Sequence, residues 1–507
     1  MFLRKKTGVL YIPSLLVSHY GEPLDDKTLF RKAEVKLERS TKTLLKRLNR
    51  NPAAVRMALG LEQELFIIDS ETYEKRLDIR TTGRALIGKM PPKNQQFSDH
   101  YYGKIPRKVE EAFDAVEKEL LEIGIPCKTR HKEVAPNQFE FCPLFEEAGK
   151  TIDHNMILME IMKETFHERG LEVLLHEKPF ANLNGSGKHC NWSLNFVDEH
   201  GNLNNLFSIP KKKEDVLLFR LFVLIQLKAL LKNGPLHLAA VAPTGNELRL
   251  GGHEAPPRII SAFLGSTVSE ILDNKEVHER MNLRDELPNL NYDINQEDTD
   301  RNRTSPYAYT GNKFEFRAVG SSQNVSFVMS VIAATIAKEV DAVNERLDKG
   351  EKIEEIMASL LEETKPVRFS GNGYSHEWVE EAKKRGLYVN EKFFENYENF
   401  KEAGKIFVEL GLYKETELAA RFNTMSSLYE NTVKAESDCL LSIIGSEIVP
   451  RCYEFLKLVD RESSSKRINK RSAEFVELFD ELLAKEENLK ASHEKAKTLE
   501  DMAALRA

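Results

Sequence analysis

The sequence predicts an α+β protein in which a region of mixed strands and helices precedes a mostly helical C-terminal region. Short apolar segments such as 57–68 are typical of strands. Longer segments with apolar side chains among many Lys, Arg and Glu residues, such as 24–50, are typical of half-exposed helices. Beyond about residue 350 glycine is sparse and Leu, Glu and Lys are abundant, which predicts helices.

The expected elements alternate along the chain. Besides 24–50, helices are expected at 109–123, where Gly124 closes an amphipathic pattern, at 153–168, at 214–232, from about 257 onward and at 328–347. Besides 57–68, strands are expected as two short pieces within 126–145, at 171–179 and at 313–317. Loops are expected at 80–106, 244–256 and 284–312, which are rich in Gly, Pro or polar residues.

The last helices contain a partial heptad pattern. Phe475, Leu478, Leu482 and Leu489 have heptad-like spacing, but the apolar pattern lapses at Lys485 and Ser492. A two-helix hairpin is therefore favoured over a long coiled coil.

Composition limits the possible functions. The 507 residues include 73 Lys and Arg and 80 Asp and Glu, for a net charge of −7, which argues against a general nucleic-acid binder. The five cysteines are scattered and none forms a Cys-x-x-Cys motif, so neither a disulfide framework nor a cysteine zinc site is indicated. This usage predicts a reducing, cytoplasmic setting.

Two apolar stretches could be mistaken for targeting or membrane segments. The first sixteen residues superficially resemble a signal peptide, but Pro13 interrupts the apolar run and no clear small-residue cleavage site follows. The stretch 216–231 contains Arg220, Gln226 and Lys228 and is followed by Asn-Gly-Pro at 233–235, so it is better interpreted as a buried helix ending there than as a membrane span. No membrane partner is expected.

A polar turn at 184–187, Asn-Gly-Ser-Gly, is the first candidate for a binding element. Its glycines permit close approach of a ligand to the backbone, and His189, a possible metal ligand, follows directly. Alone the signal is weak, because most Gly-Ser turns beside a histidine are only turns.

Two carboxylates lie close together in the first predicted strand. Glu62 and Glu64 are two residues apart, so their side chains point to the same face. A solvated strand face is the ordinary explanation, but the flanking residues are apolar, and a buried acidic pair favours a bound metal. Glu133 and Glu140 are seven apart, and a bend at Pro136 could turn both toward one site.

Basic residues could complete an anion site. In the strand 313–317, Lys313, Glu315 and Arg317 share one face, which suits either a metal and phosphate site or an exposed ladder of ion pairs. Arg249 and the Arg-Asn-Arg segment at 301–303 are further candidate anion clamps, although surface arginines are common.

Six segments together resemble the glutamine synthetase family. They begin at residues 60 (GLEQELF), 128 (KTRHKEVAPNQFE), 184 (NGSGKH), 249 (RLGGHEAPP), 300 (DRNRTSP) and 311 (GNKFEFRAVGSS). The segments PPKNQQ at 91–96 and LLHEKPFA at 174–181 indicate the long type III form. The resemblance runs from about residue 12 to about residue 455, with the segments in the family's order.

The resemblance implies a fold and an activity. Antiparallel strands would line an active-site funnel covered by helices. The enzyme would be a glutamate–ammonia ligase: ATP phosphorylates the side-chain carboxylate of glutamate, and ammonia then displaces phosphate to give glutamine. Two divalent metal ions, Mg or Mn, would be required, with ATP, glutamate and ammonia as substrates, and the protein would be a homo-oligomer built from rings.

The resemblance also implies roles for particular residues. One metal would be held by Glu64, Glu133 and Glu140, and the other, which bridges ATP phosphates, by Glu62, His189 and Glu315. The implied substrate residues are Asn184 and Gly185 beside glutamate, Arg249 on its α-carboxylate, Arg303 and Arg317 on phosphate, Glu254 closing the site and deprotonating ammonium, and His131 and Ser193 at the nucleotide.

The sequence departs from the family pattern in two ways. Family members carry a small N-terminal β-domain that reaches a neighbour's active site, whereas the residues ahead of Glu62 are predicted to be mostly helical, so that domain is expected to be missing. Near the place of one phosphate-side arginine of shorter family types stands Ala308.

These expectations define three regions and leave two alternatives. The regions are a helical lead-in (1–56), a glutamine synthetase catalytic domain (57–350) and a helical C-terminal region (351–507). One alternative is a γ-glutamyl-amine ligase, which uses an amine in place of ammonia. The other is a shortened, non-catalytic homologue that assembles with or regulates a full-length enzyme.

Overall fold

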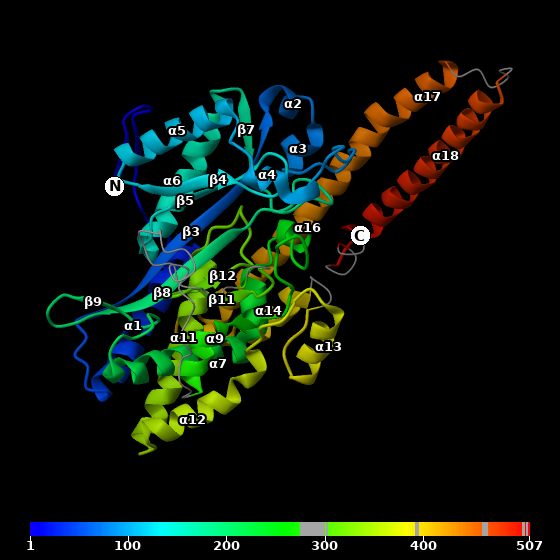
Figure 1. The fold of residues 1–507 in the computed structure, drawn as a ribbon. Helices are drawn as coiled ribbons and strands as arrows, with labels where there is room; N and C mark the ends of the chain where they lie inside the picture. The colour runs from blue at the N-terminus through cyan, green and yellow to red at the C-terminus, as the bar shows by residue number, and fades with distance from the viewer. Residues whose placement is uncertain are drawn as a thin grey trace, which may run out of the picture.

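A mostly antiparallel sheet forms the centre of the protein, as a computed structural model shows (Figure 1). The structure describes residues 1–273, 300, 303–390, 395–458, 465–498, 502 and 505–506. The strands of the sheet are β3 (Ala54–Asp69), β4 (Cys127–Lys132), β5 (Gln138–Pro143), β6 (Glu146–Glu147), β7 (Leu171–Leu174), β8 (Lys188–Val197), β9 (Leu203–Asn205), β10 (Ala262–Phe263), β11 (Tyr307–Tyr309) and β12 (Phe314–Phe316).

The long strand β3 organises this sheet. The main strand order is β10-β11-β12-β8-β3-β5-β4, and only the pair β10–β11 is parallel among the described strands. Strand β3 pairs with β8 from Ala54, opposite Val197, to Gln63, opposite Lys188. Farther along it pairs with β5 and β7. A separate hairpin, β1 (Phe2–Arg4) and β2 (Val9–Tyr11), lies at the N-terminus, and β3 already begins at Ala54, so the prediction that the residues ahead of Glu62 are mostly helical is wrong.

Helices pack around the sheet and form the C-terminal part. They are α1 (Asp26–Arg47), α2 (Ser70–Glu74), α3 (Leu77–Thr82), α4 (Asp99–Tyr102), α5 (Arg107–Glu122), α6 (Ala148–His167), α7 (Val216–Ala240), α8 (Thr244–Glu247), α9 (Gly265–Leu272), α11 (Ser326–Asp348), α12 (Ile353–Glu363), α13 (His376–Lys384), α14 (Glu395–Ala403), α15 (Lys405–Glu409), α16 (Glu415–Ile443), α17 (Val449–Leu458) and α18 (Lys466–Lys495). Short 3₁₀ turns lie at Gln96–Ser98, Lys213–Asp215 and Lys365–Val367, and a π-helical turn at Ile444–Ile448 joins α16 to α17. Among the described residues, no helix is long and apolar enough to cross a membrane.

One face of β3 is covered by helices. Leu59 and Leu61 are buried in a core that α1, α7 and α11 share, and Leu65 and Ile67 are buried in a second core beneath α5 and α6. Because strand side chains alternate, the residues between them point to the opposite face. The carboxylates of Glu62 and Glu64 therefore lie on the face that these helices leave open.

Helix α1 illustrates how the covering helices are specified. Asp25 caps its N-terminus by accepting a hydrogen bond from the backbone N of Thr28 at 2.6 Å. Leu29, Leu37 and Leu44 are buried on one side of the helix, against α11 and β3. The predicted helix at 24–50 is confirmed, as are the strand at 57–68 and the two short strands within 126–145.

The prediction that the apolar helix ends before residue 233 is wrong. Helix α7 continues to Ala240 across a kink at Asn233, where φ is −118° and ψ is 24°. Pro235 lacks the backbone N–H that a regular helix needs, and the side chain of Asn233 donates to the carbonyl of Ala229 at 2.9 Å. Burial of Leu236 and Leu238 favours continuation of the helix beyond the kink.

Other predictions also need correction. The loops expected at 80–106 and 244–256 contain the short helices α4 and α8. The helix expected from about 257 begins only at Gly265, because Ile259 and Ala262 form isolated β-bridges with Val389 and Arg368 and keep the chain extended. The strand expected at 171–179 ends at Leu174. In the loop expected at 284–312, residues 284–299 and 301–302 lie outside the described part, and the remainder contains β11.

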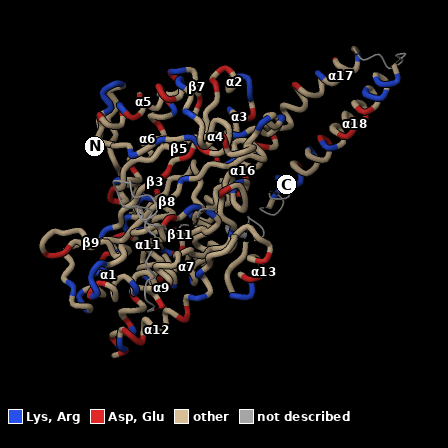
Figure 2. The backbone as a smooth tube through the Cα atoms, viewed as in Figure 1, with Lys and Arg blue, Asp and Glu red and all other residues tan. Residues whose placement is uncertain are grey.

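The C-terminal helices form the predicted hairpin. Helices α17 and α18 run side by side (Figure 1), with Phe475 packed on Phe455 at 4.6 Å between ring centroids and Phe479 on Tyr453 at 5.2 Å. Many residues of α18 are charged, basic ones at its start and acidic ones farther along (Figure 2), as expected for a solvated helix. Leu478, a member of the heptad-like pattern, is 64% exposed, so the pattern does not form a continuous seam.

We expect Leu44→Ala to lower the free energy of unfolding by about 2–5 kcal/mol, because Leu44 is fully buried and its removal leaves a cavity under α1. Chemical denaturation followed by circular dichroism measures this change. Lys46→Ala, on the exposed side of the same helix, should unfold like the wild type; equal effects of the two substitutions would contradict the packing described here.

Candidate active site

The face of the sheet opposite the covering helices carries a strip of polar side chains. On β8, His189, Asn191 and Ser193 point to this face, while Cys190 and Trp192 point into the core. The alternating sequence His-Cys-Asn-Trp-Ser thus places polar residues on the open face of β8 and apolar residues in the core. Strand pairing then places residues from β3, β5 and β12 beside the strip.

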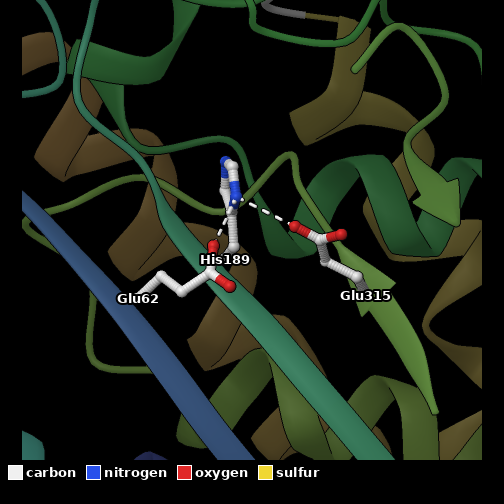
Figure 3. Close-up of side chains that lie close together, drawn as sticks. All are labelled: Glu62, His189 and Glu315. Atoms are coloured by element: carbon white, nitrogen blue, oxygen red, sulfur yellow. Dashed lines mark hydrogen bonds and ion pairs between the residues drawn. The ribbon is translucent and has the colours of Figure 1, made fainter. Parts of the chain in front are cut away.

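Glu62, His189 and Glu315 form the first cluster (Figure 3). His189 Nδ1 lies 3.0 Å from Glu62 Oε2 and 3.1 Å from Glu315 Oε1. The register of the strands explains why these three side chains lie together. Glu62 on β3 is directly opposite His189 on β8, and Glu315 on β12 is opposite Asn191 on β8. Asn191 also donates to Glu62 Oε1 at 2.9 Å. The structure therefore brings together the three residues expected to share one metal.

The charges of this cluster are strongly coupled. Burial alone would lower the pKa of His189, but its hydrogen bonds with Glu315 and Glu62 raise that pKa to about 10. For Glu315, burial favours a higher pKa, yet the hydrogen bond with His189 and the charge of Arg317 hold its pKa at about 2. Protonated His189 thus provides a positive charge between the carboxylates of Glu62 and Glu315.

Glu133, Glu140 and His131 form a second cluster. His131 Nε2 lies 3.0 Å from Glu140 Oε1, and His131 Nδ1 lies 3.4 Å from Glu133 Oε1. The hairpin of β4 and β5 forms the bend at Pro136 that turns Glu133 and Glu140 toward one site. The backbone N of Glu133 donates to the carbonyl of Gln138 at 2.9 Å and closes the turn.

Glu64 lies between the two clusters. It is opposite Glu140 in the pairing of β3 with β5, its Oε2 accepts from the backbone N of Gly187 at 2.6 Å, and its Oε1 lies 3.7 Å from His189 Nε2. The resemblance implied that Glu64, Glu133 and Glu140 share one metal. In the structure Glu64 is opposite Glu140, and His131 completes the cluster with Glu133 and Glu140.

The second cluster has the chemistry of a cation site. Burial and the nearby charges of Glu64 and Glu140 raise the pKa of Glu133 to about 9. The hydrogen bond with Glu140 raises the pKa of His131 to about 9, against the effect of burial. Glu133 Oε1 is buried and accepts no hydrogen bond from any residue that the structure describes. Carboxylate oxygens in this condition fit Mg²⁺ or Mn²⁺, which prefer hard oxygen ligands.

Two arginines meet these carboxylates. Arg317 Nη2 lies 3.2 Å from Glu315 Oε2, and Arg317 Nη1 lies 2.9 Å from Asp300 Oδ2. Burial alone would lower the pKa of Arg303, but the charges of several carboxylates, including Glu133 and Glu254, raise it. Both predicted phosphate-side arginines therefore lie at the clusters; Arg301 lies outside the described residues.

Arg249 lies beneath the turn at 184–187. It is 3% exposed, and its guanidinium donates to the carbonyls of Arg317 and Val319 at 3.1 and 3.2 Å. A Cβ added at Gly187 would stand 2.2 Å from Arg249 Nη2, and one added at Gly185 would stand 2.8 Å from Arg249 Cγ. These two glycines are therefore needed for the arginine to support the turn. Its predicted contact with a substrate carboxylate stays a prediction.

The turn itself contacts the glycine-rich loop. Asn184 is 4% exposed and donates through Nδ2 to Glu254 Oε2 at 2.9 Å. Burial is the main cause that raises the pKa of Glu254, which favours proton uptake by its carboxylate. Ser193 lies farther along the polar strip and accepts a hydrogen bond from Asn195 Nδ2 at 3.2 Å. Its expected nucleotide contact, like that of His131, stays a prediction.

Several residues at the site had no signal in the sequence. Phe145 lies over Gly60, where an added Cβ would meet its ring at 2.3 Å, yet Phe145 remains 43% exposed. Tyr101 contacts the ring of His131, with 5.9 Å between centroids, and hydrogen-bonds to Arg303. Lone aromatic residues are usually core residues, so only the fold could place them here.

A mainly apolar pocket of about 390 Å³ lies beside the site rather than over the carboxylates. It is lined by residues of the segment 85–91, by Ile67 and Ile68 at the end of β3, and by residues 180–183, which lead into the turn. Its lining offers no carboxylate or imidazole, so we assign the chemistry to the clusters and not to this pocket.

Two carboxylate and imidazole clusters flanked by arginines define a class of protein that can hold divalent cations beside an anionic substrate. Two family models match the chain: the glutamine synthetase catalytic domain matches residues 39–246, and the glutamine synthetase C-terminal domain matches residues 352–467. The chain belongs to the glutamine synthetase family.

Curated relatives are similar in sequence to this chain over most of its length. It is 39% identical to a glutamine synthetase of Bacteroides fragilis over 87% of this chain and 62% of that protein. It is 37% identical to a type-3 glutamine synthetase of Dictyostelium discoideum over 91% of this chain and 64% of that protein. For a glutamine synthetase of Butyrivibrio fibrisolvens the identity is 36%, over 91% and 67%. The chain thus spans 62% to 67% of the length of these relatives.

We expect Mn²⁺ binding near pH 7.5 to release about one proton or more per site. Metal ligands must be deprotonated, whereas Glu133, His131 and His189, with pKa values of about 9 to 10, are protonated at this pH. Affinity should therefore rise as the pH rises from 7 toward 9. Titration calorimetry in buffers of different ionisation enthalpy measures the release. Glu133→Gln should release fewer protons, and a binding enthalpy that does not depend on the buffer would contradict the assignment.

Proposed function

We propose that this protein is an ATP-dependent glutamate–ammonia ligase. The products would be glutamine, ADP and phosphate. The observation that carries the proposal is the meeting of Glu62, His189 and Glu315 beside the second carboxylate cluster, with Arg303 and Arg317 directed at the same place. Membership of the glutamine synthetase family supports the same reaction.

Two divalent ions, Mg or Mn, would bind at this face. Glu62, His189 and Glu315 would hold one, and Glu64, Glu133 and Glu140 the other, with His131 alongside. When bound, such ions stabilise the charge that develops on a transferring phosphoryl group. The raised pKa values of Glu133 and His189 support this assignment, since protons take the place that cations would otherwise fill.

The remaining residues of the chain suit the two chemical steps. In the first step the γ-phosphoryl group of ATP moves to a side-chain oxygen of glutamate; Arg303 and Arg317 would neutralise its charge. In the second step Glu254, whose pKa burial raises, would take a proton from ammonium, and the ammonia would attack the acyl carbon and expel phosphate. Asn184, Gly185 and Arg249 would hold glutamate at the turn.

The nucleotide would lie along the polar strip of β8. Ser193 supplies a hydroxyl there, and the half-exposed ring of Phe145 over Gly60 supplies a flat apolar surface of the kind on which a base stacks. His131, at the edge of the second cluster, would also contact the nucleotide.

The presence of every residue that the resemblance implies as a metal ligand argues against a non-catalytic homologue, because a chain without activity would be free to lose these ligands. An amine in place of ammonia is the remaining alternative, and product analysis by mass spectrometry with ammonium and with simple amines separates the two. The boundaries 1–56, 57–350 and 351–507 remain our proposed division of the chain.

We also propose a homo-oligomer built from rings, in the cytoplasm. Near the N-terminus, Leu10, Ile12 and Leu16 are 51%, 60% and 60% exposed, and such a run of exposed apolar side chains is typical of an interface. The five cysteines are free, which suits a reducing compartment. Light scattering coupled to size exclusion tests the assembly.

Glu62→Ala should reduce glutamine formation from glutamate, ammonium and ATP by at least about 100-fold, because loss of an outer-shell metal partner alone costs 10–100-fold and Glu62 is a proposed direct ligand. The assay follows glutamine and phosphate together, with Mg²⁺ or Mn²⁺. Glu71→Ala serves as the control, since Glu71 is 82% exposed on α2 and lies outside the site. Equal activity of the two variants, or no glutamine from the wild type, would refute the proposed function.

A further inference from the structure

The segment 91–96, Pro-Pro-Lys-Asn-Gln-Gln, has no role in the site as described so far. In the structure Gln95 reaches the turn at 184–187 and uses both ends of its amide there. Gln95 Nε2 donates to Asn184 Oδ1 at 2.8 Å, and Gln95 Oε1 accepts from the backbone N of Asn184 at 2.5 Å. A side chain from the long 80–106 segment is thus joined to the centre of the site by two hydrogen bonds.

These bonds determine which way the Asn184 amide points. A primary amide has one accepting end and one donating end. Because Gln95 occupies the accepting oxygen, Asn184 presents its Nδ2 to Glu254 Oε2, 2.9 Å away. The reverse orientation would place the amide oxygen of Asn184 against the carboxylate of Glu254, where two acceptors repel.

The Glu254 loop needs such a contact. His253 and Glu254 have φ values of 51° and 64°, in the left-handed region that non-glycine residues seldom adopt. Asn184 is buried, whereas Gln95 is half-buried at the edge of the site. The hydrogen bond from Asn184 therefore helps to retain a strained loop, and its donor direction depends on Gln95.

We propose that Gln95 is a positioning residue for substrate binding: by orienting the Asn184 amide, it holds Glu254 and the loop 248–256 over the glutamate site. This inference rests on the proposed function for its kinetic consequence, but not for its structural one. Gln95 acts through Asn184 and need not contact any substrate.

Gln95→Glu tests the direction of the hydrogen bonds. The new carboxylate can still accept from the backbone N of Asn184, but it cannot donate to Asn184 Oδ1, so the Asn184 amide should rotate and lose its bond to Glu254. We expect the KM for glutamate to rise about 10-fold with an unchanged KM for ATP, as loss of a hydrogen bond to a charged group implies. Gln96→Glu, an exposed neighbour with the same charge change, should leave both constants unchanged.

Hydrogen exchange of residues 248–256, followed by mass spectrometry, gives a readout that needs no activity. Exchange should become faster in Gln95→Glu and not in Gln96→Glu. Combining Gln95→Glu with Glu254→Gln should restore protection, because a glutamine at 254 can donate to the rotated Asn184 oxygen. Unaltered exchange in Gln95→Glu, or no recovery in the double variant, would overturn the proposal. A wild type that forms no glutamine would refute the proposed function, and the exchange result would still decide the role of Gln95.

Discussion

The repulsion among carboxylates gathered on one face of a sheet is the constraint on which this structure depends. Glu64, Glu133, Glu140 and Glu315 are each less than a tenth exposed, and charges of one sign at that depth remain ionised only beside compensating positive charge. The chain supplies part of it through its histidines and arginines, and takes up protons for part of the remainder. Bound cations would supply the rest of the positive charge.

Periodicity was sufficient to predict most elements around this face. The apolar pattern of 24–50 and the short apolar run at 57–68 correspond to α1 and β3 within a few residues. The errors arose where contacts distant in sequence overrode local signals. Asn-Gly-Pro at 233–235 is a strong local stop, yet burial of the residues beyond it favours continuation of α7. Likewise, the bridges of Ile259 and Ala262 to residues more than a hundred positions later keep that segment extended.

The resemblance named the candidate site residues and grouped Glu62 with His189 and Glu315, but local sequence patterns could not show how the strands bring them together. Two-residue spacing indicated that Glu62 and Glu64 share a face, but the pairing of Glu62 with His189 depends on the register of β3 with β8, which no local pattern reveals. The grouping of His131 with Glu140 depends on the pairing of β4 with β5 in the same way. Gln95 carried no chemical signal, because a glutamine acts only through its partner, and that partner lies far away in the sequence.

The division of β8 between core and site limits how this protein can change during evolution. Insertion or deletion of one residue within the strand would turn Cys190 and Trp192 toward the polar strip and send His189 into the apolar core. The same applies to β3, in which Leu61 and Glu62 would exchange faces. A change of length is therefore tolerated more easily in segments between strands, such as the exposed turn at 198–202 after β8. Inside these two strands, a substitution keeps the alternation of faces, whereas an added residue keeps it only if a β-bulge absorbs it.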